Sequence, residues 1–135
     1  MKTNTTTKYI SDYEYESTTA KGQKVKIDMK ATGKEDQSPM ELVLSALSGC
    51  LAVEVALMIQ KRKRTLNDLV IEAEGTRQDE APKYYKNIHL KFILTSPDAN
   101  NEELEKVTKL SLEKYCSVAS SLKADITFNT EVVRG

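Results

Sequence analysis

The sequence has little of what metal centres and nucleic-acid-binding surfaces require. It contains one histidine and only two cysteines, which lie far apart, and this gives no spacing suited to a metal ion. Twenty basic residues balance twenty acidic ones, so the chain lacks the basic excess that neutralises phosphates. No glycine-rich phosphate loop occurs. We therefore expect no metal, no cofactor and no nucleic-acid partner.

The chain also lacks an apolar leader. Its first ten residues, MKTNTTTKYI, contain no hydrophobic core of signal-peptide length, so we expect a cytoplasmic protein. The most hydrophobic stretch, residues 42–59, is interrupted by Glu54 and by small polar residues. We interpret it as a buried helix and expect no membrane partner. Two distant cysteines in such a chain do not indicate a structural disulfide; they either fill the core or are redox-active.

Alternating apolar and polar residues predict strands of an antiparallel sheet. The first two, at residues 9–15 and 25–29, are expected to pair as a hairpin. Three more follow at residues 69–74, 88–94 and 126–132. With two intervening helices the order is ββ-α-ββ-α-β, which indicates a single α+β domain spanning residues 1–135.

The clearest local signal is the start of the first helix. Ser38 is a suitable N-cap, Pro39 occupies the first helical position, and Glu41 completes a capping box. We predict a helix from Pro39 to about Lys63, closed by a solvated basic run at residues 61–64. Because this helix is apolar nearly all round, it must be surrounded by protein, and we expect a homodimer.

A second helix is predicted from residue 100 or 101 to about residue 122, and each helix carries one cysteine. Gly49 precedes Cys50 in the middle of the first helix, where glycine costs about 1 kcal/mol relative to alanine. Either close helix packing or backbone room for a ligand explains it. Cys116 likewise lies among small residues, 117–121. The spacing alone does not show that the two thiols meet.

The segment SPMELVLSALSGC, residues 38–50, resembles the signature of the OsmC/Ohr family, the osmotically inducible and organic-hydroperoxide-resistance proteins. The later segment EKYCSV, residues 113–118, is similar to the second cysteine motif of that family. The resemblance implies antiparallel sheets around long central helices, in an intertwined homodimer with its active sites at the subunit interface. It also implies reduction of small organic hydroperoxides by Cys50, with Cys116 as the resolving cysteine and an external dithiol as reductant.

The peroxidases of the family carry a glutamate directly after the proline and an arginine near the N-terminus. Here Met40 follows Pro39, and no arginine precedes Arg62, so the chain is more similar to the uncharacterised OsmC-like branch. A rival hypothesis is therefore a non-catalytic module that binds a small apolar molecule at the dimer interface.

If the site is catalytic, a cation must favour the Cys50 thiolate. Lys24 and Lys26 are the candidates, whereas we interpret Glu41 as a capping residue. Glu54, one turn beyond Cys50, either orients such a lysine or reaches a polar seam of the dimer.

Overall fold

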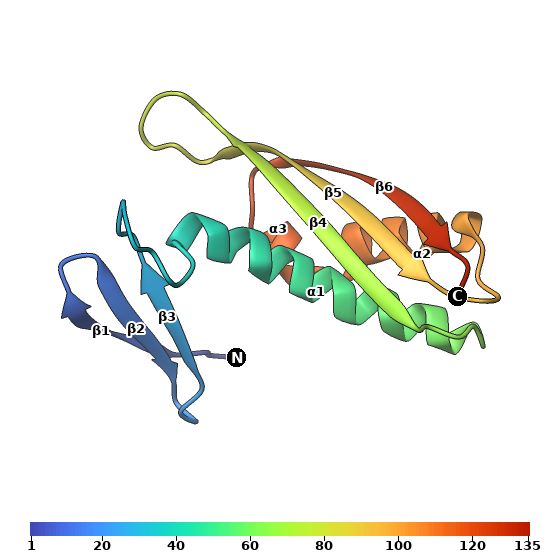
Figure 1. Ribbon diagram of the computed structural model, residues 1–135, viewed down its shortest axis with the longest axis horizontal. Coiled ribbons are helices and arrows are strands. Elements are labelled where there is room, and N and C mark those ends of the chain that lie inside the picture. The colour runs from blue at the N-terminus through green and yellow to red at the C-terminus, as the bar shows by residue number, and fades with distance from the viewer. The chain divides into compact units, whose positions relative to one another are not determined.

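The computed structural model describes residues 1–135, which form two compact units, residues 1–43 and 44–135. The N-terminal unit holds a three-stranded antiparallel sheet in the order β1-β2-β3 (Figure 1). Its strands are β1 (Thr5–Ser11), β2 (Glu14–Thr19) and β3 (Lys24–Asp28).

The predicted strand at residues 9–15 is wrong, because a tight turn at Asp12 and Tyr13 divides it into β1 and β2. Tyr9 and Tyr15 are cross-strand partners whose rings meet edge to face with centroids 5.7 Å apart. Tyrosines that face each other across a hairpin lie on the same side of the sheet. The two tyrosines are spaced in the sequence as if they lay on one face of a single strand, but they share a face because β1 and β2 pair.

Helix α1 (Pro39–Lys61) begins at the residue that the capping signal predicted. The Glu41 amide donates to Ser38 Oγ at 3.3 Å, and the Ser38 amide donates to Glu41 Oε1 at 3.0 Å. These reciprocal bonds satisfy amides that a helix start leaves without intrahelical acceptors. The predicted capping role of Glu41 is confirmed.

The C-terminal unit contains a second sheet in the order β4-β5-β6. The expected α+β class is confirmed, but β6 pairs with β5 in parallel, not antiparallel as predicted. The helical segment between β5 and β6 returns the chain to the end of the sheet at which β5 begins, so both strands run the same way. The elements are β4 (Asp68–Arg77), β5 (Tyr85–Thr95), α2 (Asn101–Leu110), a π-helical turn η1 (Ser111–Tyr115), α3 (Ser117–Ser120) and β6 (Asp125–Val133).

The core of this unit lies on one face of the sheet, along which the helices run (Figure 1). Alternate residues of β5 are fully buried, as the predicted inward face requires, whereas His89 on the other face is exposed. One stripe of α1 at four-residue spacing is also fully buried. The buried residues of these two elements are Leu47, Leu51, Val55 and Ile59 of α1 and Ile88, Leu90, Phe92 and Leu94 of β5.

Helix α1 is long and apolar enough, by length and composition, to cross a membrane, and it is the one helix of the chain that meets this test. Core helices of soluble proteins meet it too. Only 22% of its most apolar window is buried. Val53 and Leu57 are 59% and 48% exposed, so α1 leaves a wide apolar face uncovered.

Candidate functional site

Cys50 and Cys116, which are 66 positions apart in the sequence (116 − 50), come together in the C-terminal unit. Cys50 is half-buried on α1, and Cys116 follows η1 and is 2% exposed. Both are free thiols, and the Cys50 side chain is a hydrogen-bonding neighbour of Cys116. The structure thus joins the two residues whose meeting the sequence spacing left open.

The backbone around Cys116 differs from the continuous helix that we predicted. Helix α2 ends at Leu110 and is followed directly by the π-turn η1. The amide of Cys116, the residue after η1, donates to the Ser111 carbonyl at 2.9 Å. Cys116 itself is extended, with φ −81° and ψ 101°. The Ala119 amide then donates to Cys116 Sγ at 3.3 Å. Cys116 therefore caps the start of α3 and does not lie inside a helix.

Three serines lie just after this break. Ser117 follows Cys116 directly, Ser120 and Ser121 lie within the next four residues, and Ser121 Oγ donates to the Ser117 carbonyl at 2.9 Å. Such side chains compete with the backbone for helical hydrogen bonds. A π-turn offsets the following residues by one position, and such turns are frequent at functional sites. Here it ends directly at the buried thiol.

The two thiols occupy different electrostatic environments. Burial raises the pKa of Cys116, and the hydrogen bond and charge of Cys50 raise it further, while the Ala119 amide acts in the opposite direction. The net shift is upward from the ordinary value of 9.0. Cys116 is thus a protonated thiol at neutral pH, and Cys50 is the more accessible sulfur.

The residues predicted to support the cysteines have varied surroundings. Glu41, besides capping α1, pairs with Lys34, and these contacts lower its pKa to about 2. Lys24 and Lys26 are exposed on β3 of the N-terminal unit, where Lys24 lies 3.7 Å from Glu16. Glu54 is half-buried on α1 and forms no ion pair.

A second polar cluster, which sequence reasoning missed, connects the end of α1 with the start of α2. Glu103 accepts from Nε of Arg62 at 3.2 Å and from Nε of Arg64 at 3.1 Å. It also forms a capping box with Asn100. Two arginines of the basic run at residues 61–64 therefore bind a buried carboxylate instead of forming only a solvated cap.

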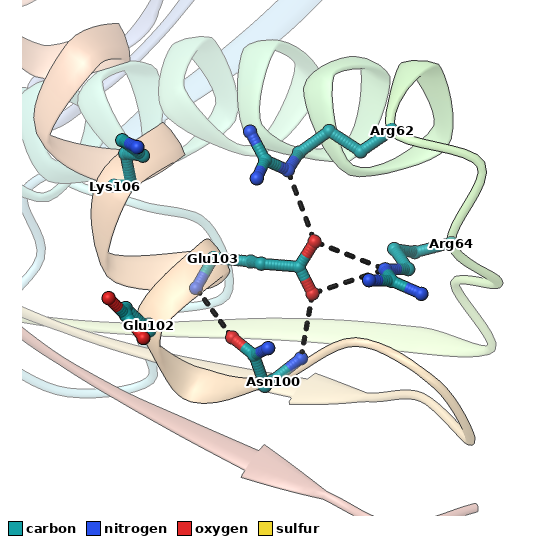
Figure 2. A pocket seen from close by; sticks show the side chains of 6 residues that line it. All are labelled: Arg62, Arg64, Asn100, Glu102, Glu103 and Lys106. Carbon is teal, nitrogen blue, oxygen red and sulfur yellow. Dashed lines mark hydrogen bonds and ion pairs between the residues drawn. The ribbon is translucent and has the colours of Figure 1, made fainter.

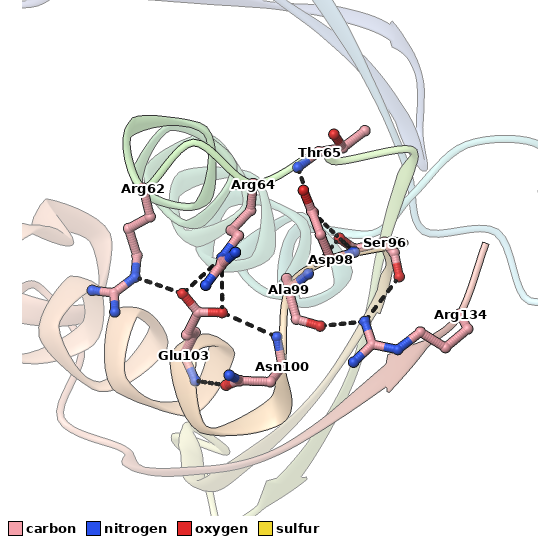
Figure 3. A network of polar contacts seen from close by, with 9 residues as sticks. All are labelled: Arg62, Arg64, Thr65, Ser96, Asp98, Ala99, Asn100, Glu103 and Arg134. Atoms are coloured by element: carbon pink, nitrogen blue, oxygen red, sulfur yellow. Dashed lines mark hydrogen bonds and ion pairs between the residues drawn. The ribbon is translucent and has the colours of Figure 1, made fainter.

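The same cluster continues toward the C-terminus (Figure 3). Asp98 accepts from the Thr65 amide at 2.9 Å, and Arg134 donates to the carbonyls of Ser96 and Ala99. The signal available in the sequence was Asn100 followed three residues later by Glu103, the spacing of a capping box. These contacts fix both ends of the loop before α2.

The C-terminal unit thus holds two free cysteines close together, one half-buried and one buried. The family is established by comparison: residues 31–131 match the family model described as OsmC-like protein, and the chain belongs to this family.

Relatives span nearly the whole chain. Protein YhfA of Escherichia coli is 34% identical over 128 residues, covering 93% of this chain and 95% of its own. The crystal structure of a hypothetical protein from Aquifex aeolicus superimposes with a TM-score of 0.88 at 26% identity, over 100% of this chain and 98% of that one. The organic hydroperoxide resistance protein OhrB of Bacillus subtilis has the same fold, with a TM-score of 0.64, 16% identity and 98% of each chain covered.

Proposed function

We propose that this protein reduces small organic hydroperoxides through a Cys50/Cys116 thiol–disulfide cycle in the cytoplasm. The observation that carries the proposal is the meeting of an accessible thiol with a buried one in a family whose members include organic hydroperoxide resistance proteins. Two thiols that are only core material have no reason to differ in this way, since both would be buried.

In the first step the Cys50 thiolate attacks the terminal peroxide oxygen. The O–O bond breaks, the alkoxide leaves and takes a proton to become an alcohol, and Cys50 is oxidised to a sulfenic acid. In the second step Cys116 attacks the Cys50 sulfur, a disulfide forms, and the hydroxide leaves as water with the Cys116 proton. An external dithiol then reduces the disulfide by exchange and is itself oxidised.

The roles follow from accessibility and charge. Cys50 is half-exposed and can meet a peroxide, whereas Cys116 is buried with a raised pKa and remains a thiol until the sulfenic acid forms beside it. Lys24 and Lys26 remain our candidates for the cation that favours the Cys50 thiolate, with Glu54 as the residue that orients it.

The wild-type protein treated with one equivalent of an organic hydroperoxide is expected to form an intramolecular Cys50–Cys116 disulfide. Mass spectrometry of the intact and proteolysed protein detects the loss of two hydrogens and the cross-linked peptide pair. The thiols should reappear after treatment with a dithiol. An unmodified protein that leaves the hydroperoxide unconsumed would refute the peroxidase proposal.

We also propose that two copies of the chain form a homodimer. In the C-terminal unit, α1 exposes a stripe of small and apolar residues without polar side chains, namely Ala46, Gly49, Val53 and Leu57. These positions recur every three or four residues, so they share one face of the helix. A second copy packed on this face would bury it, as a helix that is apolar nearly all round requires.

Gly49→Leu is expected to weaken the dimer at least about tenfold while leaving the chain folded. Apart from the adjoining residues and the nearby backbone of α1 itself, no atom of the chain lies within 4 Å of the position that a Cβ at Gly49 would occupy, so a single copy tolerates the larger side chain. A second copy approaching this stripe closely does not. Sedimentation measures the change.

Gly49→Ala is the matched control, because it adds one methyl group and favours the helix by about 1 kcal/mol. It should keep the dimer. Equal dimerisation of wild type and Gly49→Leu would show that the stripe is not the contact.

The alternative is a module that binds a small apolar molecule without chemistry. The N-terminal unit favours it through an apolar cavity of about 410 Å³, lined by residues that include Tyr13, Tyr15, Ile27 and Met29. Binding of an environment-sensitive apolar dye, unchanged in Cys50→Ser, together with no hydroperoxide consumption by wild type, would favour this alternative.

A further inference from the structure

A polar cavity of about 290 Å³ lies between the end of α1 and the start of α2. It uses neither cysteine. Figure 2 shows the six side chains that line it: Arg62, Arg64, Asn100, Glu102, Glu103 and Lys106. We propose that this cavity binds a phosphoryl group through Arg62, Arg64 and Lys106.

Glu103 holds the two arginines in place while leaving most of their donors unused. Each guanidinium contacts the carboxylate only through Nε, so both terminal amino groups of Arg62 and of Arg64 have no acceptor in the protein. The Glu103 side chain is 10% exposed, whereas those of Arg62 and Arg64 are 42% and 38% exposed. An anchored guanidinium with free terminal donors is ready to form the paired hydrogen bonds that phosphate oxygens accept.

Lys106 adds a third cation to the same region. It lies three residues after Glu103, on the same side of α2, and forms no ion pair in the structure. Figure 2 shows the terminal nitrogens of Arg62 and the Lys106 amine on one side of the Glu103 side chain, and the Glu102 carboxylate on the other. Arg62 and Lys106 thus lie apart from the Glu102 carboxylate, and Arg64 lines the same cavity from beyond the Glu103 carboxylate.

The charges favour an anion over a neutral ligand. The cavity contains three cationic and two anionic side chains, and Glu103 is already satisfied by both arginines and by the Asn100 amide at 3.1 Å. The start of α2, a helix of ten residues, adds the positive end of its dipole and amides without intrahelical acceptors. The free terminal donors of two guanidiniums exceed what one carboxylate accepts, which favours the three oxygens of a phosphoryl group.

Preorganisation and size are consistent with this ligand. The Glu103 contacts fix the arginine side chains before a ligand arrives, which reduces the entropy lost on binding. A water molecule occupies about 30 Å³ of liquid volume, so the cavity is large enough for a tetrahedral oxyanion and part of the molecule that carries it. Both free phosphate and a phosphate monoester present this chemistry.

Isothermal titration calorimetry with inorganic phosphate and with AMP, against sodium chloride of equal ionic strength, tests the site. We expect saturable binding to wild type and about tenfold weaker binding to Lys106→Gln, because one charge-assisted hydrogen bond is lost. Lys106 has no partner in the chain, so this variant keeps its fold. Lys109→Gln, an exposed change on the same helix but outside the cavity, is the matched control and should bind as wild type does.

Tighter binding of AMP than of inorganic phosphate would support the site and identify a phosphate ester as its ligand. Equal binding would support the site with the free anion as ligand. Heats that sodium chloride reproduces, or equal affinities of wild type and Lys106→Gln, would overturn the proposal. Arg62→Gln should weaken binding further, and its thermal unfolding checks that the variant is still folded.

Discussion

Cys50→Ser is expected to consume no organic hydroperoxide, whereas Cys116→Ser should consume one equivalent and stop at a sulfenic acid on Cys50. A serine at position 50 leaves no thiolate that can attack the peroxide oxygen, so the loss should be complete. A serine at position 116 leaves the first step intact and removes only the thiol that resolves it. A dimedone-type probe followed by peptide mass spectrometry measures the label.

The asymmetry between the two variants is what distinguishes the proposed roles. Two inert core thiols would both resist oxidation, and two merely exposed thiols would oxidise slowly and alike. Because the pKa of Cys116 is raised by burial and by its contact with Cys50, resolution of the sulfenic acid in wild type should accelerate as pH rises toward and above 9.0. Label on Cys116 instead of Cys50 would reverse our assignment of the roles.

Much of the fold could be predicted because local signals and tertiary structure agree. The capping residues Ser38 and Glu41 gave the start of α1, and the alternating pattern of β5 gave its buried face. The turn at Asp12 and Tyr13 was missed because tyrosines paired across a hairpin keep the parity of one strand. The parallel orientation of β6 relative to β5 could not be predicted, because it depends on the path of the helical segment before β6 and not on the local sequence of the strand.

The site was only partly accessible from the sequence. Small residues around Cys50 and Cys116 marked both positions, but their meeting depends on how α1 and η1 pack. The π-turn before Cys116 contains no glycine or proline, so the sequence carried no signal that the helix is interrupted there. Glu103 was missed for a different reason: its arginine partners lie 41 and 39 positions away, and ion pairs of that separation leave no periodic signal.

Glu103→Ala is expected to lower the free energy of unfolding by about 2 to 3 kcal/mol. The change removes a carboxylate that is 10% exposed and accepts hydrogen bonds from Arg62, Arg64 and the Asn100 amide. Breaking a fully buried pair costs more, but both arginines are more than a third exposed and regain water as a partner. Chemical denaturation followed by circular dichroism measures the loss.

Glu105→Ala is the matched control, because Glu105 is exposed on the same helix and forms no ion pair. It should change stability by less than about 0.5 kcal/mol. If both substitutions changed the free energy of unfolding equally, the contacts of Glu103 with Arg62, Arg64 and Asn100 would contribute nothing to stability. Because both variants place alanine in α2, differences in helix propensity cancel between them.

The pH dependence of this stabilisation gives an independent check. Burial alone would raise the pKa of Glu103, but the hydrogen bonds from Arg64, the Asn100 amide and Arg62 outweigh it, and the pKa lies below its ordinary value of 4.5. A carboxyl whose pKa is lower in the folded state stabilises the fold fully above its unfolded pKa and loses that effect as the pH falls through the folded pKa. The stability difference between wild type and Glu103→Ala should therefore be constant above about pH 5 and shrink progressively below pH 4.5. A difference that stays constant down to pH 2 would show that the ionised carboxylate is not what holds the start of α2 to the end of α1.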